Sequence, residues 1–169
     1  MITRILPPEA VHQGDLILVN AHHPCHPLPQ PDLVTVAGPG VQLERRAAQA
    51  LDSLMAAIDG WKGIVPVSGW RALAEQQAIW DGSLAENGLP FTQTYVACPG
   101  CSEHQTGLAI DLGLNQGEID FIRPAFPYEG LCQTFRQTMA QYGWVQRYPA
   151  GKEAITGIGH EPWHFRYVG

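Results

Sequence analysis

Two short polar segments in the last third of the chain constrain its fold most strongly. Residues 102–111 read Ser-Glu-His-Gln-Thr-Gly-Leu-Ala-Ile-Asp, and residues 159–164 read Gly-His-Glu-Pro-Trp-His. Together they offer His104, Asp111 and His164, which are the ligand types that Zn²⁺ prefers. A fold that uses this set must bring the two segments together. Three protein ligands leave a fourth position open, which is typical of catalytic zinc and not of structural zinc.

The first of these segments runs into a predicted strand over residues 108–113. Side chains alternate between the two faces of a strand. The apolar Leu108, Ile110 and Leu112 therefore point to the core, and Asp111 points the other way. Ala109 and Gly113 point the same way as Asp111, and because both are small they leave room for a metal and a substrate. His104 precedes Asp111 by an odd number of residues, so the pair needs the bend that Gly107 can supply.

The second segment supplies a candidate general base, Glu161, three residues before His164. Pro162 favours extended geometry at the residue before it. We therefore predict that Glu161 and His164 lie on a loop that leads into a strand, rather than on the single helix that carries the zincin motif.

The four cysteines allow three interpretations. Cys98-Pro-Gly-Cys101 has the spacing of a redox pair, and Cys25 with His26 could complete a second, structural zinc site. The spacing is also that of two thiols in a tight loop. Because a polar loop with a proposed ligand follows directly, instead of the helix of a thioredoxin-like unit, we favour the tight loop.

Length and charge exclude several classes of protein. The chain has 169 residues, 45% of them hydrophobic, which is enough for one core without disulfide bonds. Its net charge of −6 argues against a nucleic-acid partner. No stretch approaches the ~20 apolar residues of a membrane span, and the N-terminus has no apolar run of signal-peptide length. We expect a cytoplasmic protein.

The remaining pattern predicts an α+β single domain, with a small antiparallel sheet packed against helices and the zinc site at the sheet face. A proline-rich arm (1–40) precedes the catalytic domain (41–169). Apolar spacing predicts helices over 42–58, after 68–71 and over 129–142. Further strands are predicted over 16–19, 64–67, 94–97, 144–148 and 164–168.

From about Val65 to Gly169 the chain resembles the VanY/VanXY family of zinc-dependent D,D-peptidases. The resemblance is carried by residues 68–71 with Gln76, and by residues 83–89, 99–105, 155–158 and 161–169. It implies hydrolysis of D-alanyl-D-alanine termini of peptidoglycan precursors, in wall metabolism or glycopeptide resistance, with a peptide ending in D-Ala-D-Ala as the partner.

The same resemblance implies a role for each site residue. His104, Asp111 and His164 would bind a single catalytic Zn²⁺, and Glu161 would be the general base. Arg71 would face the scissile carbonyl or the terminal carboxylate, for which a guanidinium is chemically suited. Gln76 and Ser102 would line the substrate pocket, and Trp163 would form a wall of it. For Arg71 the alternative is a surface ion pair with Glu75.

Two other functions stay open at this stage. One is a phage-type L,D-endopeptidase of the same architecture, and the other is a D-Ala-D-Ala binding protein without catalysis. The presence of all three candidate ligands and of the candidate base Glu161 favours an enzyme.

Overall fold

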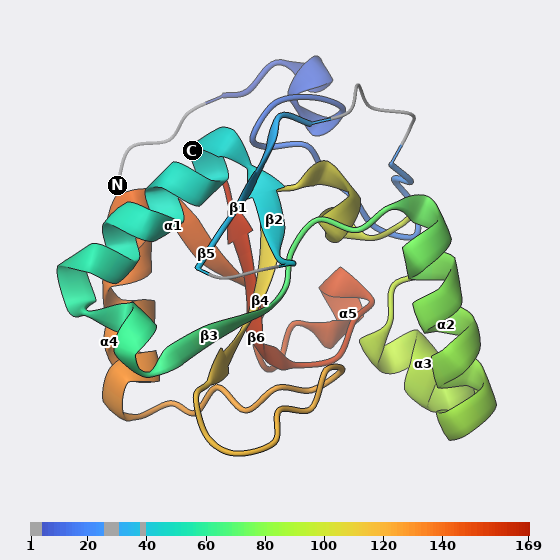
Figure 1. Cartoon of the computed structure of the whole chain (residues 1–169). Helices are drawn as coiled ribbons and strands as arrows, with labels where there is room; N and C mark the ends of the chain where they lie inside the picture. The colour runs from blue at the N-terminus through green and yellow to red at the C-terminus, as the bar shows by residue number, and fades with distance from the viewer. Residues whose placement is uncertain (1–4, 26–30, 38–39) are drawn as a thin grey trace.

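A four-stranded antiparallel sheet forms the centre of the computed structural model, which describes residues 5–25, 31–37 and 40–169 (Figure 1). The strands of this sheet lie in the order β3 (Ile64–Ser68), β4 (Ala109–Leu114), β6 (Glu161–Tyr167) and β5 (Trp144–Tyr148). A separate two-stranded sheet pairs β1 (Leu33–Thr35) with β2 (Gln42–Glu44).

The helices lie on two sides of the central sheet (Figure 1). On one side are α1 (Arg45–Ile58) and α4 (Gly130–Thr138), and on the other are α2 (Leu73–Asn87) and α3 (Leu89–Tyr95). The short helix α5 (Glu153–Thr156) precedes β6. Four 3₁₀ turns complete the described elements: η1 (Pro8–Val11), η2 (Gly60–Lys62), η3 (Glu103–Thr106) and η4 (Met139–Tyr142).

The core lies between α1, α4 and the sheet. Leu51, Leu54 and Met55 of α1 are almost completely buried, as the predicted apolar stripe requires. The helix begins later than predicted, because residues 42–44 pair with β1 and Glu44 caps the helix. Its carboxylate accepts hydrogen bonds from the backbone amides of Arg46 and Ala47.

The predicted alternation of β4 is confirmed. Leu108, Ile110 and Leu112 belong to the core cluster, whereas Asp111 lies among polar groups on the other face. Direct pairing of β4 with both β3 and β6 makes it an inner strand. The position of Asp111 is therefore fixed from both sides.

Two predicted strands are wrong. Residues 16–19 form no strand, although Ile17 and Val19 are buried in the core. Residues 94–97 do not form a strand either, because α3 continues to Tyr95 and the amide of Val96 still donates to the carbonyl of Thr92. Pro90 in the first turn favours the start of this helix, and the β-branched residues Thr92 and Thr94 adopt the helical conformation that follows.

The other elements and the α+β class are confirmed, with β6 starting earlier than predicted, at Glu161. The division into an arm and a catalytic domain stays a prediction. Three parts of the predicted arm (1–4, 26–30 and 38–39) lie outside the described residues, and His26 is in one of them. Among the described residues, no helix is long and apolar enough to cross a membrane.

Candidate metal centre

The register of β4 and β6 joins the two polar segments. Asp111 and His164 are direct partners across the two strands, although 53 residues separate them in the chain. Asp111 Oδ1 lies 2.9 Å from His164 Nδ1, and both side chains are buried. Opposite positions in an antiparallel pair point to the same face of the sheet, so this register alone places two candidate ligands side by side.

His104 reaches the same point from η3. Gly107 ends this turn with a left-handed backbone (φ 73°), which supplies the bend that the sequence required. His104 Nδ1 donates a hydrogen bond to the carbonyl of Gly69 (2.7 Å), and Nε2 lies 3.2 Å from Asp111 Oδ2. A backbone carbonyl that binds one ring nitrogen fixes the tautomer and leaves the other nitrogen for a metal.

The donor atoms of His104, Asp111 and His164 all lie within 4.8 Å of one another, and all three residues are buried. Two imidazole nitrogens and one carboxylate oxygen are a suitable donor set for Zn²⁺. Both nitrogens of His164 face carboxylates, Asp111 at Nδ1 and Glu103 at Nε2 (3.2 Å). A neutral imidazole donates from one nitrogen only, so this arrangement calls for a proton or a metal cation between His164 and Asp111.

The surroundings of the cluster favour positive charge at this point. Burial alone would lower the pKa of His164, but the hydrogen bonds to Asp111 and Glu103 outweigh it and raise the pKa to about 9. Burial would raise the pKa of Asp111, and the charges and hydrogen bonds of His104 and His164 hold it well below its usual value. Metal binding at such a site displaces the proton of the histidine.

Glu161 lies beside the cluster at the start of β6. Its Oε2 is 3.8 Å from His164 Nδ1. In a regular strand, residues three apart point to opposite faces. The pairing is irregular here, since Gln146 and Tyr148 of β5 pair with Phe165 and Glu161 of β6. The predicted loop is therefore wrong, and an irregular strand brings Glu161 to the site.

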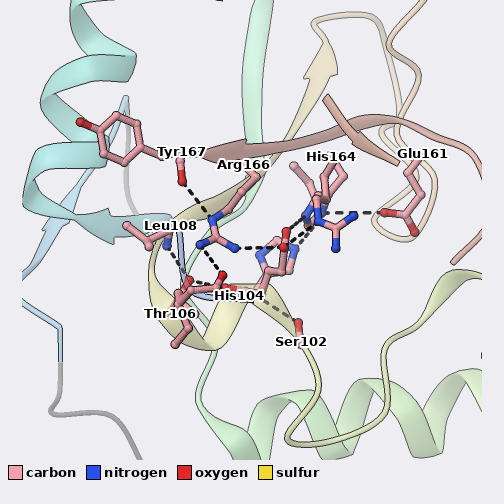
Figure 2. Close-up of polar contacts among 12 residues, drawn as sticks. Ser102, His104, Thr106, Leu108, Glu161, His164, Arg166 and Tyr167 are labelled. Atoms are coloured by element: carbon pink, nitrogen blue, oxygen red, sulfur yellow. Dashed lines mark hydrogen bonds and ion pairs between the residues drawn. The ribbon is translucent and has the colours of Figure 1, made fainter. Parts of the chain in front are cut away.

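Burial raises the pKa of Glu161 to about 8, against the lowering effect of His164, and Asp111 adds to the increase. A cation held by His104, Asp111 and His164 would lower this pKa toward the range in which a carboxylate acts as a base near neutral pH. Figure 2 shows Glu161 and Arg166 on either side of His164.

Arg71 is a buried part of the site, with 8% of its surface exposed, so the surface ion pair with Glu75 is wrong. Its guanidinium donates to Asp111 Oδ2 (3.0 Å), Ser68 Oγ (2.8 Å) and Gln76 Oε1 (3.2 Å). Three acceptors hold the group rigidly at the edge of the pocket.

The three predicted substrate-binding residues all line the same pocket. Gln76 is fully buried. Its side-chain oxygen accepts a hydrogen bond from Arg71, and its side-chain nitrogen donates to the carbonyl of Ala97 (2.8 Å). Ser102 Oγ accepts a hydrogen bond from the amide of His104 (3.3 Å). Trp163 is buried and belongs to the core cluster. Their roles stay predictions, and the contacts of Gln76 indicate that it orients Arg71.

The pocket residues that the sequence interpretation missed include Glu103 and Tyr148, which both contact His164. Glu103 is buried next to His164, and Tyr148 of β5 packs against the His164 ring, with 4.8 Å between the ring centroids. Glu103 stands directly before His104 in the first polar segment, which was the available signal. Nothing in the local pattern marks Tyr148, because strand pairing alone brings it to the site.

Residues 160–164 spell His-Glu-x-x-His, yet they do not form the metal site of a zincin. The segment enters a strand, and His160 Nε2 lies 2.7 Å from the hydroxyl of Tyr128. His160 therefore takes no part in the group formed by the three candidate ligands.

Cys98 and Cys101 are free thiols in a tight turn, in which the amide of Cys101 donates to the carbonyl of Cys98 (2.8 Å). Burial, together with the hydrogen bond to Cys98, raises the pKa of the Cys101 thiol to about 12. A thiol with a raised pKa is a poor nucleophile at neutral pH, so Cys101 is not suited to be an attacking thiol. The alternative of a second, structural zinc site includes His26, which lies outside the described residues.

Comparison with known proteins identifies the family. Residues 40–169 match the family model VanY: D-alanyl-D-alanine carboxypeptidase. Over 158 residues the chain is 44% identical to the bifunctional D-Ala-D-Ala dipeptidase and D-Ala-D-Ala carboxypeptidase VanXYC of Enterococcus gallinarum, covering 91% of this chain and 83% of that protein. The chain therefore belongs to the VanY family, which confirms the resemblance found in the sequence.

Solved structures agree in fold. The D,D-dipeptidase VanXYg, bound to a D-Ala-D-Ala phosphinate analog, superimposes with a TM-score of 0.91 at 52% identity, covering 97% of this chain and 66% of that chain. VanYB with D-alanine-D-alanine has a TM-score of 0.74 at 31% identity (92% and 87% covered). The LD-carboxypeptidase LdcB has a TM-score of 0.67 at 33% identity (83% and 67% covered). The chain thus spans about two thirds of VanXYg.

Proposed function

We propose that this chain is a zinc D,D-peptidase that hydrolyses D-alanyl-D-alanine termini of peptidoglycan precursors, as a dipeptidase, a carboxypeptidase or both. The observation that carries this proposal is the buried cluster of His104, Asp111 and His164, with Glu161 at its edge. Its relative VanXYC is a D-Ala-D-Ala dipeptidase and carboxypeptidase, and VanXYg is a D,D-dipeptidase, which supports the substrate.

In this proposal His104, Asp111 and His164 would hold one catalytic Zn²⁺, and the ion would supply Lewis-acid chemistry that polarises the scissile carbonyl and makes the attacking water easier to deprotonate. Glu161 takes a proton from that water as its oxygen bonds to the carbonyl carbon. The same carboxyl then gives the proton to the nitrogen of the leaving D-alanine as the C–N bond breaks.

Arg71 stabilises the negative charge that develops on the carbonyl oxygen. Its guanidinium stays charged and is held by Ser68, Gln76 and Asp111, so little reorganisation is needed when the charge forms. Ser102 and Trp163 shape the pocket around the terminal D-alanine, and Gln76 keeps Arg71 in place.

The test is turnover of D-Ala-D-Ala and of a D-Ala-D-Ala-terminated pentapeptide by the purified protein, with and without a chelator. We expect release of D-alanine that stops with the chelator and returns on addition of zinc. His164→Ala should lose both zinc and activity. D-alanine release that persists after complete removal of metal would contradict the proposal.

A second candidate is an L,D-carboxypeptidase, which the likeness to LdcB favours. A tetrapeptide ending in L-Lys-D-Ala separates the two, because a D,D-peptidase should leave its last bond intact. A non-catalytic binding protein would retain D-Ala-D-Ala without releasing D-alanine, and the buried, well-placed carboxylate of Glu161 argues against it.

A further inference from the structure

We infer that Glu103 is a positioning residue for the metal centre: its carboxylate holds the Nε2 side of His164, so that Nδ1 is presented to the zinc. This inference rests on the zinc centre proposed above. Glu103 is 2% exposed, and its Oε2 lies 3.2 Å from His164 Nε2. A carboxylate at the far nitrogen of a ligating histidine fixes the orientation of the ring and makes the nitrogen that faces the metal a better donor.

The two oxygens of Glu103 have different partners. Oε1 accepts hydrogen bonds from Arg147 Nε (2.8 Å) and Arg166 Nη1 (2.9 Å), while Oε2 faces His164. The arginines compensate the buried charge of the carboxylate. Because both arginines bond to Oε1, Oε2 is left as an acceptor for His164.

Arg166 extends this support to the N-terminal segment. Its Nη2 donates to the backbone carbonyls of Asp15 and Ile17, both at 2.9 Å. It lies two residues after His164 on the same strand and so points to the same face. Figure 2 shows Arg166 beside His164 and His104. A continuous set of contacts thus runs from residues 15–17 through Arg166 and Glu103 to His164.

A purely structural ion cluster would require only that Glu103 neutralise its two arginines. The position of Oε2 goes beyond this, because it faces a candidate ligand, whereas the hydrogen bonds of both arginines are to Oε1. Glutamine at position 103 has one acceptor oxygen and one donor nitrogen. It cannot accept from both the arginines and His164, so the substitution removes one of the two functions with little change of shape.

The experiment compares the zinc dissociation constants of wild type, Glu103→Gln and Arg147→Gln by competition with a chelating dye. Arg147→Gln is the matched control, because it breaks an ion pair of Glu103 but keeps the carboxylate beside His164. We expect Glu103→Gln to raise the dissociation constant about 10- to 100-fold, with Arg147→Gln close to wild type. Circular dichroism must show that both variants are folded. Equal zinc affinities in all three proteins would overturn the inference.

A measurement on the wild type keeps the inference testable if Glu103→Gln does not fold. In the zinc-loaded protein with ¹⁵N-labelled histidine, His164 Nε2 should carry a proton that exchanges slowly with water. An unprotonated Nε2 would overturn the inference. If the wild type binds no zinc, the proposed function fails. If it binds zinc and Glu103→Gln binds it equally well, the inference about Glu103 fails alone.

Discussion

Asp111 is the residue on which the site converges. Its carboxylate contacts His104, His164 and Arg71. It is buried on an inner strand, between the small residues Ala109 and Gly113 on the same face. Its interactions with His104 and His164 lower its pKa against the effect of burial and keep it ionised, so it can bind a cation and orient a guanidinium at once. Around it, the proposed base Glu161 and Arg71 are held by separate elements, and each can be tested by itself.

Glu161→Gln keeps the size of the side chain and removes the base. We expect the variant to fold and to bind zinc with wild-type stoichiometry, but to lose at least about 100-fold in kcat, the scale of a positioned general base. Steady-state D-alanine release and elemental analysis on the same preparation provide the check. Wild-type turnover in this variant would remove Glu161 from the mechanism.

Substitution of Arg71 distinguishes stabilisation of the transition state from simple anchoring of substrate. If the guanidinium acts on the developing charge, Arg71→Ala should lower kcat and kcat/KM together, whereas an anchor for the carboxylate would raise KM alone. Arg71→Lys should restore little, since an ammonium group cannot reproduce the planar fork that meets Ser68, Gln76 and Asp111. Unchanged kinetics in both variants would contradict either role.

Among the elements, η3 and the start of β4 are joined by a turn with a demanding backbone. Gly107 has a left-handed φ of 73°, and a Cβ there would lie 3.0 Å from the backbone nitrogen of Glu44. The carbonyl of Gly107 accepts a hydrogen bond from that same nitrogen (2.9 Å). The turn that presents His104 is therefore fixed both by its own geometry and by the start of α1.

Gly107→Ala should destabilise the fold by more than the ~1–2 kcal/mol that a left-handed non-glycine residue costs. The additional loss of stability comes from contact of the new Cβ with the backbone nitrogen of Glu44, because a backbone atom cannot move aside without disturbing the start of α1. Gly151→Ala is the matched control, because Gly151 has a similar φ of 78° and no atoms within 4 Å of a Cβ. Urea unfolding of both variants measures the difference. Equal losses of stability would show that the contact with Glu44 has no cost.

At the scale of the whole molecule, the proposed metal links elements from distant parts of the chain. Its ligands come from η3, β4 and β6, and Arg166 connects the last of these to residues 15–17. A ligand that binds the folded state and not the unfolded chain stabilises the fold by mass action.

Removal of zinc should therefore lower the Tm of the whole chain. The stabilisation is about 2.7 kcal/mol when free zinc is 100 times its dissociation constant. Calorimetry before and after chelation, followed by zinc addition, tests this. Glu161→Gln should respond as the wild type does, and His104→Ala should show no zinc-dependent shift. An unchanged Tm after complete metal removal would contradict the proposed centre.

Local patterns predicted much of the fold because they depend on neighbours in the chain. The apolar stripe of α1 and the alternation of β4 were readable directly from spacing. The failures at residues 16–19 and 94–97 have a common reason. Short apolar or β-branched runs do not determine their own conformation. Residues 16–19 are held by the packing of Ile17 in the core, and residues 94–95 continue the helix that starts near Pro90.

The sequence by itself determined the types of ligand, the candidate base and the bend at Gly107, since these follow from side-chain chemistry and local backbone freedom. Only the tertiary structure decided which of these groups meet. The pairing of Asp111 with His164, the irregular register that brings Glu161 to the site and the contact of Glu103 with His164 all depend on strand pairing and packing between distant segments. Such contacts leave no local signature, because their geometry exists only once the sheet has formed.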